Sequence, residues 1–184
     1  MCSKFNNYKI EISYDGSHFH GFQKQSDLKT VQSVIEESID LILENYKLNY
    51  AGRTDAGVHA KSQIISLSTS GSVNTAFLKS LDSLVGPEIK IKKIQKINNS
   101  FHPRFDAKSR VYKYFLQSSN TSEPYNRNYS YLVKTKIELN ELKSVPAFSF
   151  RMPCGLISFA PEDDGGATIG DLFLDESISS APTI

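Results

Sequence analysis

Along the first half of this sequence, segments with the apolar spacing of a strand and segments with the apolar spacing of a helix follow one another. The order of these segments limits the possible folds more than any other feature. Apolar residues at every second position predict a strand at residues 8–14, and apolar residues three and four apart predict a helix from Leu28 to about Tyr46. Strands are also predicted at residues 48–51, 63–69 and 89–97, with a second helix at 74–85. This order predicts an α+β, ferredoxin-like β-α-β-β-α-β unit, with an antiparallel sheet covered on one face by two helices.

A second alternating stretch follows at residues 110–117 and predicts a further strand. Residues 129–133 are predicted to pair with it, and residues 138–143 to begin a helix. Two strands and part of a helix cannot close a core by themselves, so this part is predicted to be an incomplete second half. We therefore divide the chain into an N-terminal subdomain at 1–107, the start of a second subdomain at 108–143, and a remainder at 144–184.

The amino-acid composition changes abruptly near residue 144. Residues 1–143 contain 20 basic and 14 acidic residues, a net charge of +6, whereas residues 144–184 contain one Arg and six acidic residues, a net charge of −5. The second segment also has no Lys or Asn, is rich in Gly and Pro, and shows no sustained hydrophobic period. We predict that residues 144–184 are disordered or foreign to the rest of the protein, and that the positive body suits a polyanionic partner.

Several classes of protein are not expected. No run of about 18 apolar residues is present, and the N-terminus lacks the apolar stretch of a secretory signal, so neither a membrane span nor export is predicted. The two cysteines, Cys2 and Cys154, are too few for a disulfide framework or a zinc site, which favours a cytoplasmic protein. The four histidines lack acidic partners at ligand spacing, so no metal site is predicted.

The densest group of chemically able residues is Gly52-Arg53-Thr54-Asp55-Ala56-Gly57-Val58-His59-Ala60, on a connection predicted at residues 52–61 between two strands. Glycines on either side permit unusual backbone angles, so such a loop can present Asp55 to a ligand. One alternative is a tight turn in which Asp55 bonds its own backbone and Arg53 is solvated. Another is a hydrolytic pair of Asp55 and His59, although neither an oxyanion donor nor a metal accompanies it.

This loop resembles the Gly-Arg-Thr-Asp-X-Gly-Val-His-Ala signature of the tRNA pseudouridine synthase A (TruA) family. Four further segments resemble motifs of that family in the same order. The first holds Tyr14-Asp15-Gly16 and Gly21-Phe22-Gln23-Lys24-Gln25, with Phe22 where Trp is usual, and the others are residues 31–37, 101–107 and 110–114.

The resemblance implies a pseudouridine synthase fold and a homodimer that isomerises uridine to pseudouridine in the anticodon stem-loop of tRNA, at tRNA positions 38–40, without a cofactor. Asp55 matches the family's catalytic aspartate, and a carboxylate suits a reaction that exchanges a C1′–N1 bond for a C1′–C5 bond without redox chemistry. Arg53 would pair with this carboxylate or fill the gap left by the flipped base. Tyr112 matches the tyrosine that stacks on the uracil and takes the C5 proton, the alternative being a core tyrosine.

Other side chains are candidates for RNA contact. Arg104 and Arg110 match basic positions of the family and would contact phosphates. Phe19 and Gln23 lie in the first matched loop and would contact RNA, although core packing is at least an equal alternative for Phe19. His59 is predicted to be structural or an RNA contact rather than a metal ligand.

The resemblance ends near residue 143, at the change of composition. A frameshift or gene-model error that replaced the second half of the protein would explain both observations. Three interpretations stay open: a pseudouridine synthase, a catalytically inactive RNA-binding remnant of one, and an unrelated small α+β binding domain.

Overall fold

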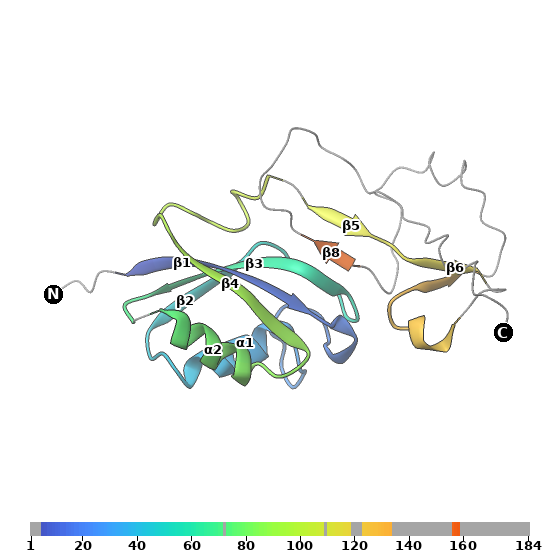
Figure 1. Cartoon of the computed structure of the whole chain (residues 1–184), viewed down its shortest axis with the longest axis horizontal. Helices are drawn as coiled ribbons and strands as arrows, with labels where there is room; N and C mark the ends of the chain where they lie inside the picture. The colour runs from blue at the N-terminus through green and yellow to red at the C-terminus, as the bar shows by residue number, and fades with distance from the viewer. Residues whose placement is uncertain (1–4, 72, 109, 119–122, 134–155, 159–184) are drawn as a thin grey trace.

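The computed structural model describes residues 5–71, 73–108, 110–118, 123–133 and 156–158. Its main body is an antiparallel sheet with two helices on one face (Figure 1). The sheet contains β1 (Asn6–Tyr14), β2 (Tyr46–Tyr50), β3 (His59–Thr69) and β4 (Ile89–Ile97), and the helices are α1 (Val31–Asp40) and α2 (Thr75–Leu84). The predicted α+β fold, with these strands and helices in this order, is confirmed.

β1 and β3 form the centre of the sheet. β1 pairs with β4 on one side and with β3 on the other, and β2 pairs with the second half of β3, all in antiparallel directions. Ile10 lies opposite Ile65 and Tyr8 opposite Leu67, and these four side chains are buried. Because successive strand residues point to opposite faces, Lys9 belongs to the face that the helices leave uncovered.

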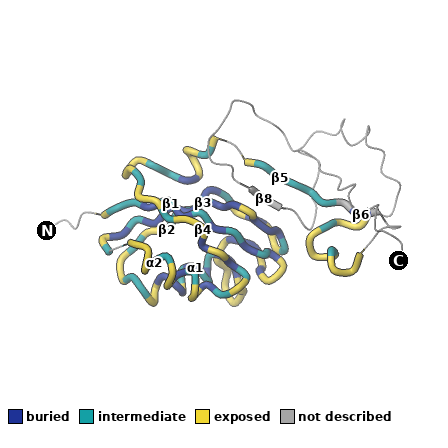
Figure 2. The backbone as a smooth tube through the Cα atoms, viewed as in Figure 1, coloured by how far each residue is buried: buried dark blue, intermediate teal, exposed yellow. Residues whose placement is uncertain are grey.

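The core fills the space between the inner face of the sheet and the two helices. Ile35 and Ile39 of α1 and Leu81 of α2 have no exposed surface, and they pack in one cluster with Ile10 and Ile12. Figure 2 shows the buried positions concentrated in the central strands and on the inner sides of the helices. The apolar spacing that predicted the helices therefore marks their buried sides at Ile35, Ile39 and Leu81, whereas Leu84 at the end of α2 is 43% exposed.

The first helix is shorter than the predicted range from Leu28 to Tyr46. It begins after Thr30, whose hydroxyl accepts a hydrogen bond from the Ser33 N–H at 3.2 Å while the Ser33 hydroxyl accepts one from the Thr30 N–H at 3.1 Å. This reciprocal capping box fixes the start, so Leu28 lies outside the helix and is 39% exposed. The helix ends at Asp40 and Tyr46 already belongs to β2, so that part of the prediction is wrong.

β3 begins at His59 rather than at Gln63, and the loop after β2 therefore covers residues 51–58 instead of 52–61. Ala60 pairs with Tyr14 of β1, and His59 and Ala60 also pair with a strand from the last part of the chain. Pairing with these distant segments makes β3 begin earlier than the alternation of apolar and polar residues in the sequence predicts.

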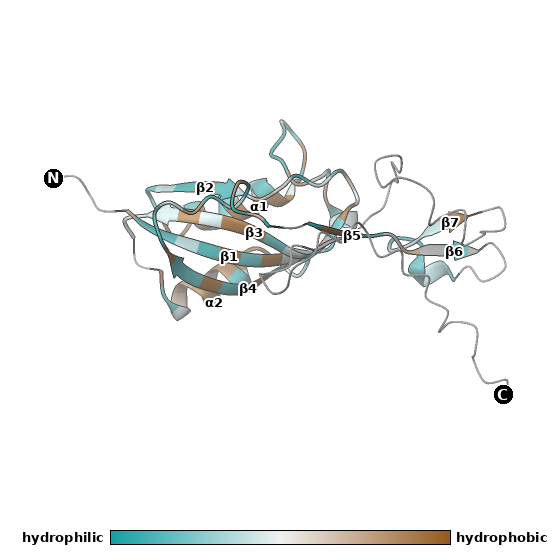
Figure 3. Ribbon diagram, turned by 90° about the horizontal axis from the view of Figure 1, so that it is seen from above, coloured by the Kyte–Doolittle hydropathy of each residue, from teal (hydrophilic) through white to brown (hydrophobic). Residues whose placement is uncertain are grey.

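The strand predicted at residues 110–117 is interrupted. β5 (Val111–Lys113) belongs to the large sheet, whereas β6 (Leu116–Ser118) pairs with β7 (Tyr131–Val133) in a separate two-stranded sheet. Figure 3 shows this small sheet beyond the end of the large one, joined to it through β5. Tyr114 and Phe115 carry the chain between the two sheets, which ends the single predicted strand. The predicted pairing with residues 129–133 is confirmed for 131–133, and it is parallel.

β8 (Leu156–Ser158) lies between β3 and β5, parallel to β3 along the stretch that β2 leaves unpaired. It belongs to the segment 144–184, for which we predicted disorder or a foreign origin. The rest of that segment and the helix predicted at residues 138–143 lie outside the described residues, so those predictions stay predictions. In the described part of the chain no helix is long and apolar enough to cross a membrane.

Candidate active site

The loop at residues 51–58 is anchored to the body of the protein before it reaches Asp55. The Gly52 carbonyl accepts a hydrogen bond of 2.6 Å from the buried Gln63 side chain. The Thr54 carbonyl accepts one of 2.9 Å from the Phe22 N–H, and the buried hydroxyls of Thr54 and Tyr14 lie 2.9 Å apart. Burial raises the pKa of Tyr14, which keeps this hydroxyl protonated and able to bond with Thr54.

The loop is also anchored after Asp55. The Val58 N–H donates to the Asp55 carbonyl at 3.2 Å and closes a turn in which Gly57 has a φ of 78°. The Gly57 N–H donates to the Phe19 carbonyl at 3.4 Å. The backbone of Asp55 is therefore fixed from both sides.

Two glycines outside the loop allow other segments to approach it closely. A Cβ at Gly16 would lie 2.0 Å from the Val58 carbonyl oxygen, and a Cβ at Gly21 would lie 2.9 Å from the Thr54 carbonyl oxygen. Gly21 also has a φ of 93°, which side-chain-bearing residues rarely adopt. The motifs Tyr14-Asp15-Gly16 and Gly21-Phe22 are thus explained by backbone packing against the loop, a role that the sequence reasoning did not assign.

The Asp55 side chain is exposed, and within the described residues its carboxylate makes no hydrogen bond or ion pair. The turn is closed by the Asp55 carbonyl and not by its side chain, so the carboxylate is available to a ligand. Arg53 is also exposed, and its guanidinium lies 5.9 Å from the centre of the Tyr50 ring. Both charged groups project from one anchored loop, while the structure records no direct contact between them.

His59, at the end of the same motif, is 5% exposed and connects the two parts of the chain. Its Nε2 lies 2.8 Å from the Asn128 carbonyl oxygen, to which an Nε2–H donates. Its Nδ1 lies 3.1 Å from the Gly16 nitrogen and 3.0 Å from Asp15 Oδ1. A neutral ring accepts the Gly16 N–H at Nδ1, whereas a protonated ring donates to Asp15 there. The structure therefore gives His59 a structural role and a nearby carboxylate that is not Asp55.

Asp15 and Tyr129 complete this contact. The Tyr129 hydroxyl donates to Asp15 Oδ2 at 2.7 Å, and the Tyr129 ring lies 4.8 Å from the His59 ring, centre to centre. Partial burial raises the pKa of Asp15, but hydrogen bonds from Ser17 and Tyr129 and the nearby His59 outweigh it and lower the pKa to about 2. We refer to Asp15, His59, Asn128 and Tyr129 as the polar clamp. Its long-range contacts were not predicted.

Arg110 joins the start of the loop to the segment after β4. Its guanidinium donates to the Ala51 carbonyl at 3.4 Å and to the Arg104 carbonyl at 3.1 Å. The Arg104 side chain is exposed and makes no contact recorded within the described residues. Arg110 thus holds two backbone segments together, and Arg104 keeps a free positive charge beside them.

Tyr112 lies on β5 and is 42% exposed, so it is not a core tyrosine. It pairs with Ile157 of β8, which in turn pairs with Ala60 of β3. Since adjacent strands lie about 4.8 Å apart, the Tyr112 backbone is roughly 10 Å from that of Ala60, just beyond the loop. Within the described residues no direct contact joins Tyr112 to Asp55 or Arg53.

The two candidates of the first matched loop lie in different environments. Phe19 is 4% exposed and packs in the core, with the Lys29 ammonium 5.1 Å from its ring centre. Phe19 therefore follows the alternative of core packing, and this burial leaves little of its ring surface for an RNA base. Gln23 is exposed and free to meet a ligand. In the described ranges no group of three or more His, Cys, Asp or Glu could hold a metal ion.

A family model described as tRNA pseudouridine synthase matches residues 11–106, which include the whole loop. The tRNA pseudouridine synthase A of Borrelia duttonii (strain Ly) is 40% identical over 137 residues, covering 73% of this chain and 56% of the relative. The protein of the same name from Pseudothermotoga lettingae is 34% identical over 139 residues, covering 74% of this chain and 57% of the relative.

The chain therefore belongs to the tRNA pseudouridine synthase family. A third relative, the tRNA pseudouridine synthase A of Borreliella afzelii (strain PKo), is 41% identical over 138 residues. The chain spans little more than half of the length of the curated relatives it matches, 56% for this one.

Proposed function

We propose that this protein isomerises uridine to pseudouridine in the anticodon stem-loop of tRNA, at tRNA positions 38–40. The observation that carries the proposal is Asp55, which lies in the segment matched by the family model and projects an unpaired, exposed carboxylate from a loop anchored on both sides. No cofactor is needed, because the reaction moves a bond and a proton without any net oxidation.

The reaction defines the roles of three side chains. The bond from ribose C1′ to uracil N1 breaks, the base turns, and C1′ bonds to C5, while C5 loses a proton and N1 gains one. Asp55 supplies the carboxylate that attacks the sugar or the ring, or assists proton removal at C2′. Tyr112 accepts the C5 proton, and Arg53 fills the gap left by the flipped base.

The remaining parts of the proposal concern assembly and RNA contact. Arg104, with its free guanidinium, contacts phosphate, and Arg110 does so while holding the loop at Ala51. Gln23 contacts the RNA from the loop after β1. We also assign residues 8–97 to a ferredoxin-like unit, supported by the antiparallel order β4-β1-β3-β2. The working enzyme is a cytoplasmic homodimer.

The experiment that tests this function maps pseudouridine in a tRNA transcript after incubation with the protein. Wild type is expected to modify uridines only within positions 38–40. Asp55→Ala is expected to give no product while its tRNA affinity stays within about twofold of wild type, because the carboxylate acts on the base and not on phosphate. Asp27→Ala, which removes another carboxylate from an exposed loop position, is the matched control and keeps the product. Product from Asp55→Ala would remove Asp55 from the mechanism.

A second candidate is a catalytically inactive RNA-binding remnant. The observation that favours it is that, within the described residues, no direct contact joins Tyr112 to Asp55 or Arg53. A remnant binds tRNA with an affinity that falls steeply with salt but forms no pseudouridine, since phosphate contacts do not depend on the catalytic groups.

A further inference from the structure

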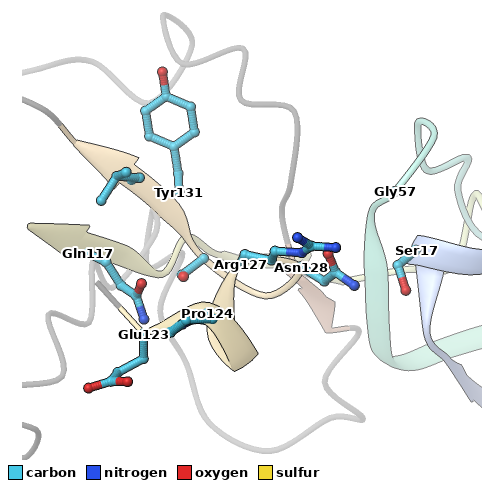
Figure 4. Close-up of a pocket in the computed structure, with 10 residues that line it drawn as sticks. Ser17, Gly57, Gln117, Glu123, Pro124, Arg127, Asn128 and Tyr131 are labelled. Atoms are coloured by element: carbon cyan, nitrogen blue, oxygen red, sulfur yellow. The ribbon is translucent and has the colours of Figure 1, made fainter. Parts of the chain in front are cut away.

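A pocket of about 600 Å³ opens beside the turn that follows Asp55 (Figure 4). On one side it is lined by Ser17 and by Gly57, two residues after Asp55. On the other side it is lined by described residues of β6, of β7 and of the stretch 123–130, including Gln117, Glu123 and Arg127. The mechanism proposed above assigns no role to these three side chains.

Gln117 is the first feature that points to a ligand. Its side chain lines the pocket and the residue is only 9% exposed. Within the described residues its carboxamide has no hydrogen-bond partner. A carboxamide offers a donor and an acceptor in one plane, and one that lines a pocket without partners is available to a ligand. The edge of a nucleobase presents the complementary donor and acceptor.

The charged side chains of the pocket determine how such a ligand is oriented in it. Figure 4 shows Arg127 and Asn128 directed toward Ser17 and Gly57, while Gln117 and Glu123 lie farther from that turn. Arg127 is exposed, and no carboxylate of the described residues pairs with it. A phosphate is attracted to the Arg127 end and repelled by Glu123. The base therefore lies at the Gln117 end, with its phosphate toward the loop.

We propose that this pocket binds a second unpaired nucleotide of the RNA, next to the target uridine. Gln117 bonds to the base edge, Glu123 accepts a hydrogen bond from an exocyclic amine, and Arg127 contacts the phosphate. A base with an exocyclic amine is therefore preferred to uracil. The inference rests on the proposed function, because it takes the RNA bound at Asp55 as its ligand.

The test uses anticodon stem-loop RNAs that carry 2-aminopurine at one unpaired position at a time, titrated with the full chain. Binding of wild type is expected to unstack one position beside the target and raise its fluorescence. Gln117→Ala is expected to abolish that rise and weaken binding about tenfold. Arg127→Gln is expected to weaken binding and reduce the salt slope by about one. The matched controls are Gln95→Ala and Lys47→Gln, at exposed positions away from the pocket.

The outcomes separate the two proposals. If wild type binds the stem-loop but Gln117→Ala and Arg127→Gln behave like their controls, the pocket is not a nucleotide site and the proposed function stands. If wild type does not bind the stem-loop, the proposed function fails and this inference fails with it. Thermal unfolding of each variant checks its fold, and Arg127→Gln provides the test should Gln117→Ala unfold, because Arg127 is exposed.

Discussion

The described residues of the range 5–97 and those of the range 98–133 are held in place by different forces. The buried hydrophobic core of the described residues lies between Tyr8 and Ile91, and the later region adds the buried Pro103. The later region instead exposes large side chains, namely Phe105, Tyr112, Tyr125, Tyr129, Tyr131 and Leu132. It is joined to the earlier one through the polar clamp, the Arg110 contact with Ala51, and β8, which pairs with both β5 and β3. The first region thus supplies the rigid support of Asp55, and the second supplies groups with lower local stability around it.

The largest expected effect is on the core of the first region. Ile35→Ala removes a side chain with no exposed surface and leaves a cavity, which is expected to lower the free energy of unfolding by about 2–5 kcal/mol. Leu132→Ala is the control from the second region, where the side chain is 42% exposed, and is expected to cost less than about 0.5 kcal/mol. Urea unfolding followed by circular dichroism measures both. Equal costs would show that the two regions are not held differently.

The next effect is the pH dependence contributed by the polar clamp. The pKa of Asp15 is lowered from 3.8 to about 2 by folding, so its contribution is complete above about pH 4 and is lost as pH falls toward 2. Because solvent screens this partly exposed carboxylate, we expect a loss of about 1–2 kcal/mol in stability over this range beyond that of Asp15→Asn. Urea unfolding of both proteins at about pH 5 and about pH 2.5 measures the difference. A wild type that loses no more than the variant would contradict the assigned hydrogen bonds.

The smallest effect concerns the attachment of the second region alone. Tyr129→Phe removes the hydroxyl that bonds to Asp15 and is expected to cost about 1 kcal/mol or less, since the ring keeps its contact with His59. Amide hydrogen exchange is expected to accelerate at residues 123–131 and to stay unchanged in β1 and α1. Tyr125→Phe is the control and should change nothing, because Tyr125 is 70% exposed and its hydroxyl makes no hydrogen bond within the described residues. Faster exchange throughout the sheet as well would mean that the clamp stabilises the core itself.

The sequence was most informative where local periods and burial coincide. The strand at residues 89–97 and the helix capped by Asn74 are found within one residue of their predicted limits. The first helix was predicted too long because its apolar spacing continues through Tyr46, which belongs to β2. The start of β3 was missed because its extra partners, in β8, lie far away in the sequence.

The same contrast applies to the candidate site. The loop motif located Asp55 and Arg53 on one exposed turn, since all of its residues are contiguous. The polar clamp joins Asp15 to Tyr129, which are 114 residues apart. The spacing of neighbouring residues in the sequence cannot predict a contact over that separation. Gly16 and Gly21 were part of recognised motifs, yet only the structure shows that a Cβ at either position would collide with the loop backbone.

The central claim is that Asp55 on this anchored loop carries out uracil chemistry. The most direct measurement is tritium release from tRNA containing C5-tritiated uridine, with the 184-residue chain at high concentration beside its Asp55→Ala variant. Because formation of the C1′–C5 bond expels the hydrogen on C5, release by the chain and none by the variant is the result we predict. No release by either protein, or equal release by both, would contradict the claim.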